Sequence, residues 1–363
     1  PAFPDFMVYD YLQEESPYRS YLYELKKHHV NQPILIAEFG MASSRDIAHW
    51  HNKGWHHGGH NELDQGKISE ILLNDIFETG MSGAILFSWF DEWYKKTWIF
   101  APYYIPSDNK KSWFNIQDPE NNYGLVATYP NYPEKKVTLS GNKKEWEMAE
   151  VLYEKKDKNL LFQFKDGFND SRNLRKLSIQ HDEGFIYIML EIEGKIDFKY
   201  ANYLIGIDTF NAEEGEFLLP FNTKVISPTG LKFLIHLCGF KKSRILTAKS
   251  YDKYLKSKTE SIKPVKSNSG EWVLMFMKTN RRRISKDGHR IFPAHILSIS
   301  NLRFGSLDRQ SPYRESIADF FVKDNLLELR IPWSIAGFTD PASKLVLWQD
   351  GDELVRKTDG IRI

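Results

Sequence analysis

Unbroken runs of apolar residues mark the first hundred residues of the chain. Runs of this kind, without polar alternation, are typical of parallel strands that are covered on both faces. They predict strands over residues 5–9, 34–37 and 83–89. The segments between these runs have helical spacing instead. We therefore expect strands and helices to alternate in this part of the chain.

Two helices are predicted between the strands. Ser16 and Pro17 are a helix cap followed by the proline favoured in a first turn, and the helix is expected to reach about His29. Apolar residues recur on one helical face over 62–79, and Gly80 ends that helix. The order strand, helix, strand, helix, strand predicts right-handed crossovers within a parallel sheet. Three strands make either a small open sheet or the last part of a larger barrel.

The pattern changes after Tyr129. Residues 131–155 predict a charged linker that contains prolines, followed by a short helix over 143–153. From 156 to 363 alternating runs are separated by turn residues, which predicts antiparallel strands and an all-β sandwich. The expected strands cover 160–164, 176–180, 185–191, 203–207, 231–237, 244–248, 272–277, 326–331 and 345–348.

Composition narrows the classes of protein to consider. The chain has 363 residues, enough for two domains, and its 49 basic and 48 acidic residues give no overall field for nucleic acid or an anionic membrane. No apolar run has the length of a membrane span, so we expect a soluble protein. Cys238 is the single cysteine, which excludes an internal disulfide and leaves the compartment, cytoplasmic or secreted, undecided. The chain begins at Pro1 without a signal-peptide pattern, and we expect it to be part of a longer protein.

Aromatic residues and one carboxylate point to the candidate chemistry. Ten Trp and eighteen Tyr give many rings that can stack on the flat faces of sugars. Glu38 stands at the end of the strand 34–37, followed by Gly40. The carboxyl ends of parallel strands are where ligands and chemistry collect, so Glu38 is a candidate catalytic group. The alternative is a glutamate that only caps a loop.

Three segments together resemble a known family of barrels. They are Pro33-Ile-Leu-Ile-Ala-Glu-Phe-Gly40, Gly58-Gly-His-Asn-Glu-Leu-Asp-Gln-Gly66 and Gly83-Ala-Ile-Leu-Phe-Ser-Trp-Phe-Asp-Glu-Trp93. In order and spacing they resemble the end of the (β/α)8 barrel in retaining glycoside hydrolases of the β-galactosidase and β-glucuronidase clan. The resemblance implies that residues 1–130 are the C-terminal portion of a TIM barrel. It also implies that Glu38 is the nucleophile.

The same resemblance implies a substrate site. It makes Trp89 a sugar platform, although packing at the barrel mouth is the alternative, and it makes Tyr9 a neighbour of the nucleophile. The residues expected to bind substrate are Tyr9, His57, His60, Gln65, Trp89, Asp91, Glu92 and Trp93. Retaining hydrolysis needs a second carboxylic acid about 5 Å away. In such barrels this acid comes from the fourth strand, which this chain lacks, so we expect it from elsewhere in the gene or from a companion chain. Asp91 or Glu92 is the weaker alternative.

The second half carries a looser resemblance. Gln180-His-Asp-Glu-Gly-Phe-Ile-Tyr-Ile188, Ile205-Gly-Ile-Asp-Thr209 and Glu328-Leu-Arg-Ile-Pro-Trp333 resemble the family-nine carbohydrate-binding and DOMON-like sandwiches. The resemblance implies a carbohydrate-binding sandwich over 156–363, with a structural appendage as the alternative. Two functions follow for the whole chain. One is a retaining glycoside hydrolase that acts on an oligo- or polysaccharide, and the other is a non-catalytic carbohydrate-binding or scaffold protein.

Three further sequence patterns are compatible with a bound ligand. The histidines at 49, 51, 56, 57 and 60 could bind zinc or copper, but a loop that hydrogen-bonds substrate hydroxyls is the preferred interpretation, and we predict no metal and no cofactor. The acidic loop from Asp208 to Glu214 admits calcium, with a solvated turn preferred. The basic run at 281–283, with Lys278 and Lys286, is interpreted as a solvated loop rather than a polyanion site.

Overall fold

The computed structural model describes residues 17–50, 56–95, 97, 114–130, 136–156, 169–252, 261–280 and 282–363. The chain divides into two compact units. The first consists of Pro1–Thr97, Asp118–Thr128 and Thr279–His295, and the second of Trp98–Gln117, Tyr129–Lys278 and Ile296–Ile363. Residues 118–128 and 279–295 thus belong to the first unit although they come later in the chain. The sequence pattern did not indicate this.

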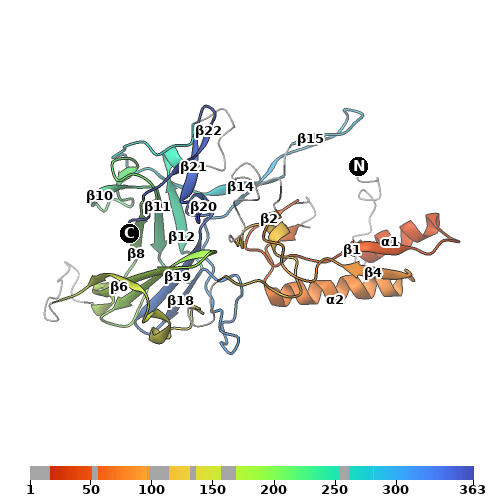
Figure 1. Ribbon diagram of the computed structural model, residues 1–363, viewed down its shortest axis with the longest axis horizontal. Helices are drawn as coiled ribbons and strands as arrows, with labels where there is room; N and C mark the ends of the chain where they lie inside the picture. Colours follow the sequence, from red (N-terminus) through yellow and green to blue (C-terminus); the bar gives the residue numbers. More distant parts are fainter. Residues whose placement is uncertain are drawn as a thin grey trace. The chain divides into compact units, whose positions relative to one another are not determined.

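The first unit contains both α-helices of the described residues, together with short strands (Figure 1). Its elements are α1 (Pro17–His28), β1 (Leu35–Phe39), β2 (Ile47–Ala48), β3 (His57–Gly58), α2 (Glu62–Glu78), β4 (Gly83–Leu86), the 3-10 helix η5 (Pro119–Asn121), β15 (Arg283–Ile284) and β16 (Ile291–Phe292). Strands β14 (Phe276–Asn280) and β17 (His295–Ser298) run across the boundaries between the two units and pair with each other.

A parallel strand pair with an intervening helix forms as the sequence predicts. Strand β1 pairs with β4 in parallel, with Leu35 opposite Gly83 and Ile36 opposite Ala84. Helix α2 lies between them in the chain and begins where Asn61 accepts a hydrogen bond from the backbone N–H of Asp64, at 2.8 Å. This local capping explains why the helix start was predictable. The predicted helices at 17–29 and 62–79 are confirmed.

The predicted barrel is wrong. In the described residues β1 and β4 form a sheet of two strands, and no further strand extends it. The side chains of Leu35 and Ile85 remain 58% and 54% exposed, so the pair is not covered on both faces as expected for a barrel strand. The described chain is predominantly β with two helices, which does not correspond to a portion of a TIM barrel.

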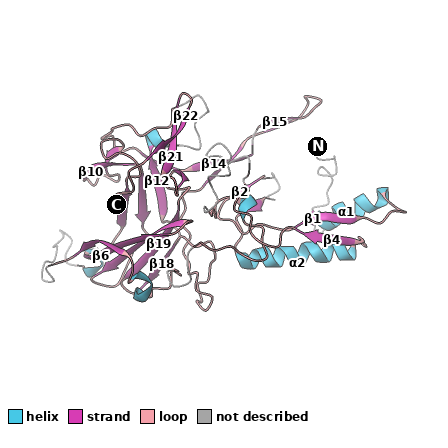
Figure 2. Ribbon diagram, in the orientation of Figure 1, coloured by secondary structure: helices cyan, strands magenta, loops and turns pink. Residues whose placement is uncertain are grey.

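The second unit is built from antiparallel strands (Figure 2). A five-stranded sheet has the order β18-β19-β7-β6-β5, a four-stranded sheet β13-β12-β11-β8 and a three-stranded sheet β20-β21-β22, and β10 pairs with β9. The strands are β5 (Glu150–Glu154), β6 (Leu174–His181), β7 (Phe185–Ile192), β8 (Tyr203–Ile207), β9 (Glu216–Leu218), β10 (Ile226–Leu231), β11 (Phe233–Leu237), β12 (Arg244–Ala248), β13 (Trp272–Leu274), β18 (Phe320–Lys323), β19 (Leu326–Pro332), β20 (Phe338–Asp340), β21 (Leu345–Asp350) and β22 (Glu353–Lys357). Short 3-10 helices are η7 (Lys143–Trp146), η8 (Asp170–Arg172) and η9 (Lys249–Tyr251).

The core of the second unit lies at the centre of its largest sheet. Every residue of β7 and β19 is buried, and these two strands are neighbours. Glu328 is buried within this core, where its carboxylate accepts hydrogen bonds from the indole N–H of Trp146 at 2.7 Å and from the backbone N–H of Gly141 at 2.6 Å. Both carboxylate oxygens thus have a hydrogen-bond donor within the core.

Several predictions for the second half need correction. The helix expected over 143–153 is wrong: η7 covers four residues and β5 then pairs with β6. Val137 and Leu139 are 2% and 0% exposed, so the described part of the expected linker belongs to the core. The strand predicted at 272–277 is divided between β13 and β14. The strand predicted at 160–164 lies outside the described residues.

In the part of the chain that the structure describes, none of the helices has both the length and the apolar character needed to cross a membrane. The sequence-based expectation of no spanning helix agrees with this.

Candidate functional site

The candidate site lies where β1 and β4 end. Glu38 is exposed, one residue before the end of β1. The chain then turns at Gly40, with φ of +153°, and a Cβ at this position would lie 2.2 Å from the carbonyl oxygen of Phe87. The backbone N–H of Phe87 donates to the carbonyl of Phe39 at 2.8 Å. A glycine is therefore needed for the two strand ends to approach each other.

A later segment runs beside the end of β4 and brings a tyrosine to the site. The N–H of Ser88 donates to the carbonyl of Tyr123 at 3.1 Å, and the N–H of Leu125 donates to the carbonyl of Ser88 at 3.0 Å. Burial raises the pKa of the Tyr123 phenol well above its usual value, and the nearby charges of Glu120, Asp118 and Glu38 raise it further. Glu38 is thus one of three carboxylates whose charge acts on the Tyr123 phenol.

Tyr123 connects this site to a group of histidines. Its hydroxyl lies 2.8 Å from Nδ1 of His57. One ligand atom each from His49, His57 and Glu120 lies within 4.8 Å of the others. Burial lowers the pKa of both imidazoles, and each is lowered further by a neighbouring histidine. His57 still keeps an exposed surface, so the ring is partly desolvated while it remains accessible.

Close backbone packing brings these groups together. Strands β2 and β3 form a hairpin in which His57 lies opposite Ala48, next to His49. Gly58 has φ of +74°, and a Cβ on it would lie 2.0 Å from the Ser44 hydroxyl and 2.8 Å from a side-chain carbon of Pro119. The hairpin can thus rest against η5 only because residue 58 has no side chain.

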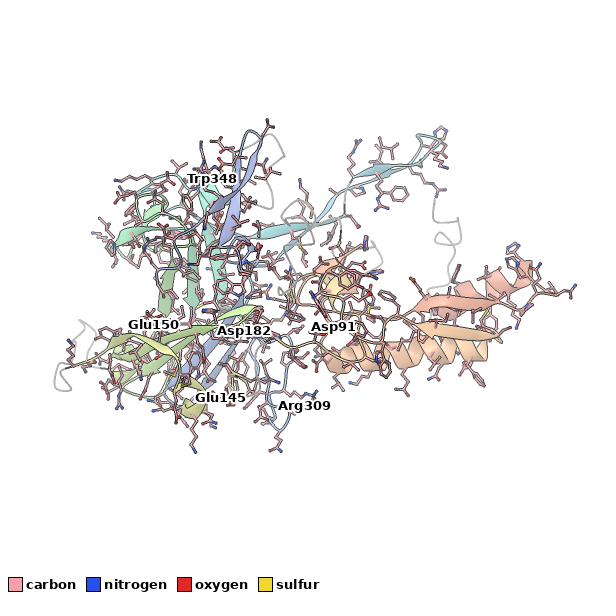
Figure 3. The ribbon with its side chains drawn as sticks, in the orientation of Figure 1. Asp91, Glu145, Glu150, Asp182, Arg309 and Trp348 are labelled. Carbon is pink, nitrogen blue, oxygen red and sulfur yellow. The ribbon has the colours of Figure 1, made fainter. Side chains whose placement is uncertain are left out.

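The side chains of Asp91 and Gln65 form hydrogen bonds with the backbone of the same region. The carboxylate of Asp91 (Figure 3) is buried and accepts hydrogen bonds from the backbone N–H groups of Gly124 and Thr128, both at 2.9 Å. The buried side-chain amide of Gln65 donates to the carbonyl of Met41 at 2.9 Å. It also makes longer contacts with the carbonyls of Asn122 at 3.4 Å and Gly124 at 3.3 Å. These contacts explain both residues structurally, and their role in substrate binding stays a prediction.

The aromatic residues after β4 differ in exposure. Trp89 is 71% exposed, whereas Trp93 is half-buried and contacts Tyr94 edge to face.

The Glu92 carboxylate accepts a hydrogen bond from the Tyr94 hydroxyl at 2.6 Å and pairs with Lys95 at 2.7 Å. Burial raises the pKa of Glu92, but the hydrogen bonds from Lys95 and Tyr94 outweigh it, and the pKa falls below its usual value. Glu92 is therefore ionised and paired with Lys95 and Tyr94. Because a general acid must carry a proton, Glu92 is a poor candidate for that role.

His60 belongs to a stack of rings. It stacks on His56, which stacks on Trp50, and Trp50 stacks on His295 with ring centres 4.5 Å apart. His60 thus lies in the histidine-rich loop predicted to bind substrate, and its ring stacks on that of His56. Tyr9 and His51 lie outside the described residues.

Sequence reasoning missed part of this site. Tyr123 and Glu120 fall in the segment after the last apolar strand, and no local pattern connects them with the histidines. His49 was included among the histidines without a preferred partner. The local signal for Glu120 is Asp118-Pro119, a helix cap followed by proline: Asp118 accepts a hydrogen bond from the N–H of Glu120 at 3.1 Å.

The acidic loop differs in part from its prediction. Asp208 is fully buried, and its carboxylate pairs with Lys232 at 2.7 Å and Arg362 at 2.9 Å, so Asp208 belongs neither to a calcium site nor to a solvated turn, whereas Glu213 is exposed. In the basic run, Arg282 and Arg283 are exposed and Arg281 lies outside the described residues.

Comparison with protein-family models, with curated proteins and with solved structures finds no match to this chain. The residue patterns that resemble a glycoside hydrolase barrel and a carbohydrate-binding sandwich are therefore not supported by any family, and the described residues form no barrel. The family assignment is wrong, and function has to be argued from the site alone.

Proposed function

We propose that the edge formed by the ends of β1 and β4 is a carbohydrate site at which Glu38 acts as the nucleophile of a retaining glycoside hydrolysis. The observation that carries this proposal is an exposed carboxylate at the end of a parallel strand, whose charge acts on the phenol of the half-buried Tyr123. Nucleophilic carboxylates must be ionised and accessible, and Glu38 is exposed.

Exposed aromatic surface supports a sugar as the ligand. Trp89 follows β4 by three residues and leaves 71% of its surface accessible. Indole rings commonly stack on the apolar face of a sugar ring while neighbouring polar groups bind its hydroxyls. The tyrosine and histidine side chains at this edge offer such groups.

A second carboxylic acid is required for retaining hydrolysis, at about 5 Å from the nucleophile. We assign it to another polypeptide segment, from the same gene or from a companion chain. Exposed apolar side chains around the strand pair support this assignment, because a parallel pair is normally covered. Leu35, Phe77 and Ile85 are 58%, 80% and 54% exposed.

The test uses 2,4-dinitrophenyl glycosides, because their leaving group departs without protonation and the missing acid is not needed. We expect the chain to release dinitrophenol from one member of a panel of such glycosides, and Glu38→Gln to lower the rate by about three orders of magnitude or more. A fluorinated sugar should label Glu38. The matched control is Glu70→Gln on the exposed face of α2, which should retain the wild-type rate.

A non-catalytic carbohydrate-binding protein is the second candidate, favoured by the exposure of Trp89. In that case no glycoside is cleaved, sugar binding is weakened by Trp89→Ala, and Glu38→Gln binds as the wild type does. Cleavage that survives in Glu38→Gln, or a label on another residue, would exclude Glu38 as nucleophile.

A further inference from the structure

Three side chains of different segments converge beside the proposed carbohydrate site. His49 follows β2, His57 lies in β3 and Glu120 lies in η5. Their ligand atoms lie within 4.8 Å of one another, and they are the one group of this kind found among the described residues. Two imidazoles and one carboxylate form a donor set that suits a borderline transition metal ion such as Zn²⁺.

We propose that His49, His57 and Glu120 bind a single Zn²⁺ ion in an open, three-ligand site. Zinc holds nitrogen and oxygen ligands at about 2.0–2.2 Å, so two donors on a tetrahedral ion lie about 3.3–3.6 Å apart. The three ligand atoms all lie within 4.8 Å of one another, which is near enough for side-chain rotations to bring them onto one ion. Sites with two histidines and one carboxylate keep a fourth position for water or substrate.

Each ligand comes from a fixed stretch of backbone. The β2–β3 hairpin sets His57 opposite the residue that precedes His49. The N–H of His49 donates to the carbonyl of Thr279 at 3.0 Å. Glu120 lies in a 3-10 helix capped by Asp118, whose carboxylate also accepts hydrogen bonds from the N–H and hydroxyl of Thr97. Preorganised ligands reduce the entropy that metal binding would otherwise cost.

The contact between Tyr123 and His57 has the form of an outer-shell interaction. Histidines that bind metal usually engage their second ring nitrogen in a hydrogen bond, which fixes the ring orientation. The Tyr123 hydroxyl lies 2.8 Å from Nδ1 of His57, so in this proposal Nε2 is the atom that binds the ion. Because Tyr123 also interacts with Glu38, the metal site borders the proposed carbohydrate site without depending on it.

The test measures zinc binding directly on the full chain without a histidine tag. Protein freed of metal with a chelator is titrated with ZnCl₂ by calorimetry, and metal content is measured after gel filtration. We expect one equivalent of zinc, and Co²⁺ in its place should give the visible absorption of a tetrahedral site. His57→Gln and Glu120→Gln should each weaken binding by about 100-fold or more, and Tyr123→Phe by about 10–100-fold.

His29→Gln is the matched control because this histidine is exposed, lies in the first unit and is hydrogen-bonded to the side chain of Gln32. It should bind zinc as the wild type does, and circular dichroism should show that each variant is folded. Less than one equivalent on the wild type, or equal weakening by His29→Gln and His57→Gln, overturns the proposal. Glu38→Gln should bind zinc normally, which separates this outcome from that of the glycosidase proposal.

Discussion

The two units differ in how they arrange their polar clusters. In the second unit, the ammonium of Lys232 contacts four oxygens: a carboxylate oxygen of Asp208 at 2.7 Å and the carbonyls of Asn211, Glu214 and Gly230 at 2.5, 2.5 and 2.9 Å. Lys232 and Asp208 are both 0% exposed. The chain itself thus supplies the cation for a set of oxygens that would otherwise resemble a calcium site.

In the first unit the polar cluster is accessible. His57 is exposed, and His49 and Glu120 are partly exposed. Apolar residues elsewhere in this unit also keep much of their surface, with Phe77 at 80% and Trp89 at 71% exposure. A buried and fully paired cluster thus stabilises the fold, whereas an accessible cluster is able to bind a ligand.

The largest effect is expected when the closed cluster loses its cation. Lys232→Met should lower the free energy of unfolding by about 3–5 kcal/mol, because it leaves a buried carboxylate with one remaining cationic partner and removes a donor that three carbonyls share. Chemical denaturation, monitored by the fluorescence of the tryptophans, provides the measurement.

Lys249→Met is the control for this change, because Lys249 pairs with Glu271 at the surface, where the two side chains are 62% and 55% exposed. A surface pair contributes about 0–1 kcal/mol. Equal stability of the two variants would show that the Lys232 cluster does not stabilise the second unit.

A second prediction compares a buried carboxylate in each unit. Burial raises the pKa of Glu328 from 4.5 to about 7 and that of Asp91 from 3.8 to about 6. A raised pKa means that the folded state binds more protons, so the stabilisation is present at low pH and is lost as pH rises through these ranges. A shift of two units or more corresponds to about 3 kcal/mol.

Hydrogen exchange read by mass spectrometry resolves the two units. Protection of β19 should fall between pH 4.5 and about 7, and that of residues 124–128 between pH 3.8 and about 6. Glu328→Gln should remove the first pH dependence and Asp91→Asn the second, each without affecting the other. A pH dependence that persists in both variants would assign it to other groups.

The smallest effects concern two glycines of the first unit. Gly58→Ala should destabilise by about 1–3 kcal/mol, because of its positive φ and its contact with Ser44, and should weaken zinc binding by displacing His57. Gly66→Ala should stabilise by about 0.5–1 kcal/mol, because residue 66 lies within α2 and a Cβ there meets nothing within 4 Å. Thermal unfolding and zinc titration of both variants test this contrast, which fails if Gly58→Ala behaves as Gly66→Ala does.

Local sequence patterns were enough to predict several helices and strands. Apolar spacing and Gly80 located α2, the unbroken apolar runs located β1 and β4, and alternation located β8 and β12 to the residue. These features depend on neighbours within a few positions, so a pattern is enough to predict them. Glu38 at the end of β1 was predictable for the same reason.

The contacts between distant segments could be seen only in the folded chain. The pairing of Asp208 with Lys232, the return of residues 118–128 to the strand ends and the grouping of His49 with Glu120 all join positions far apart in the chain. The sequence also suggested that the strand at 34–37 was covered, whereas Leu35 is exposed. Apolar spacing shows that a residue can be buried, but whether it is buried depends on which segments pack against it, and a local pattern holds no information about that.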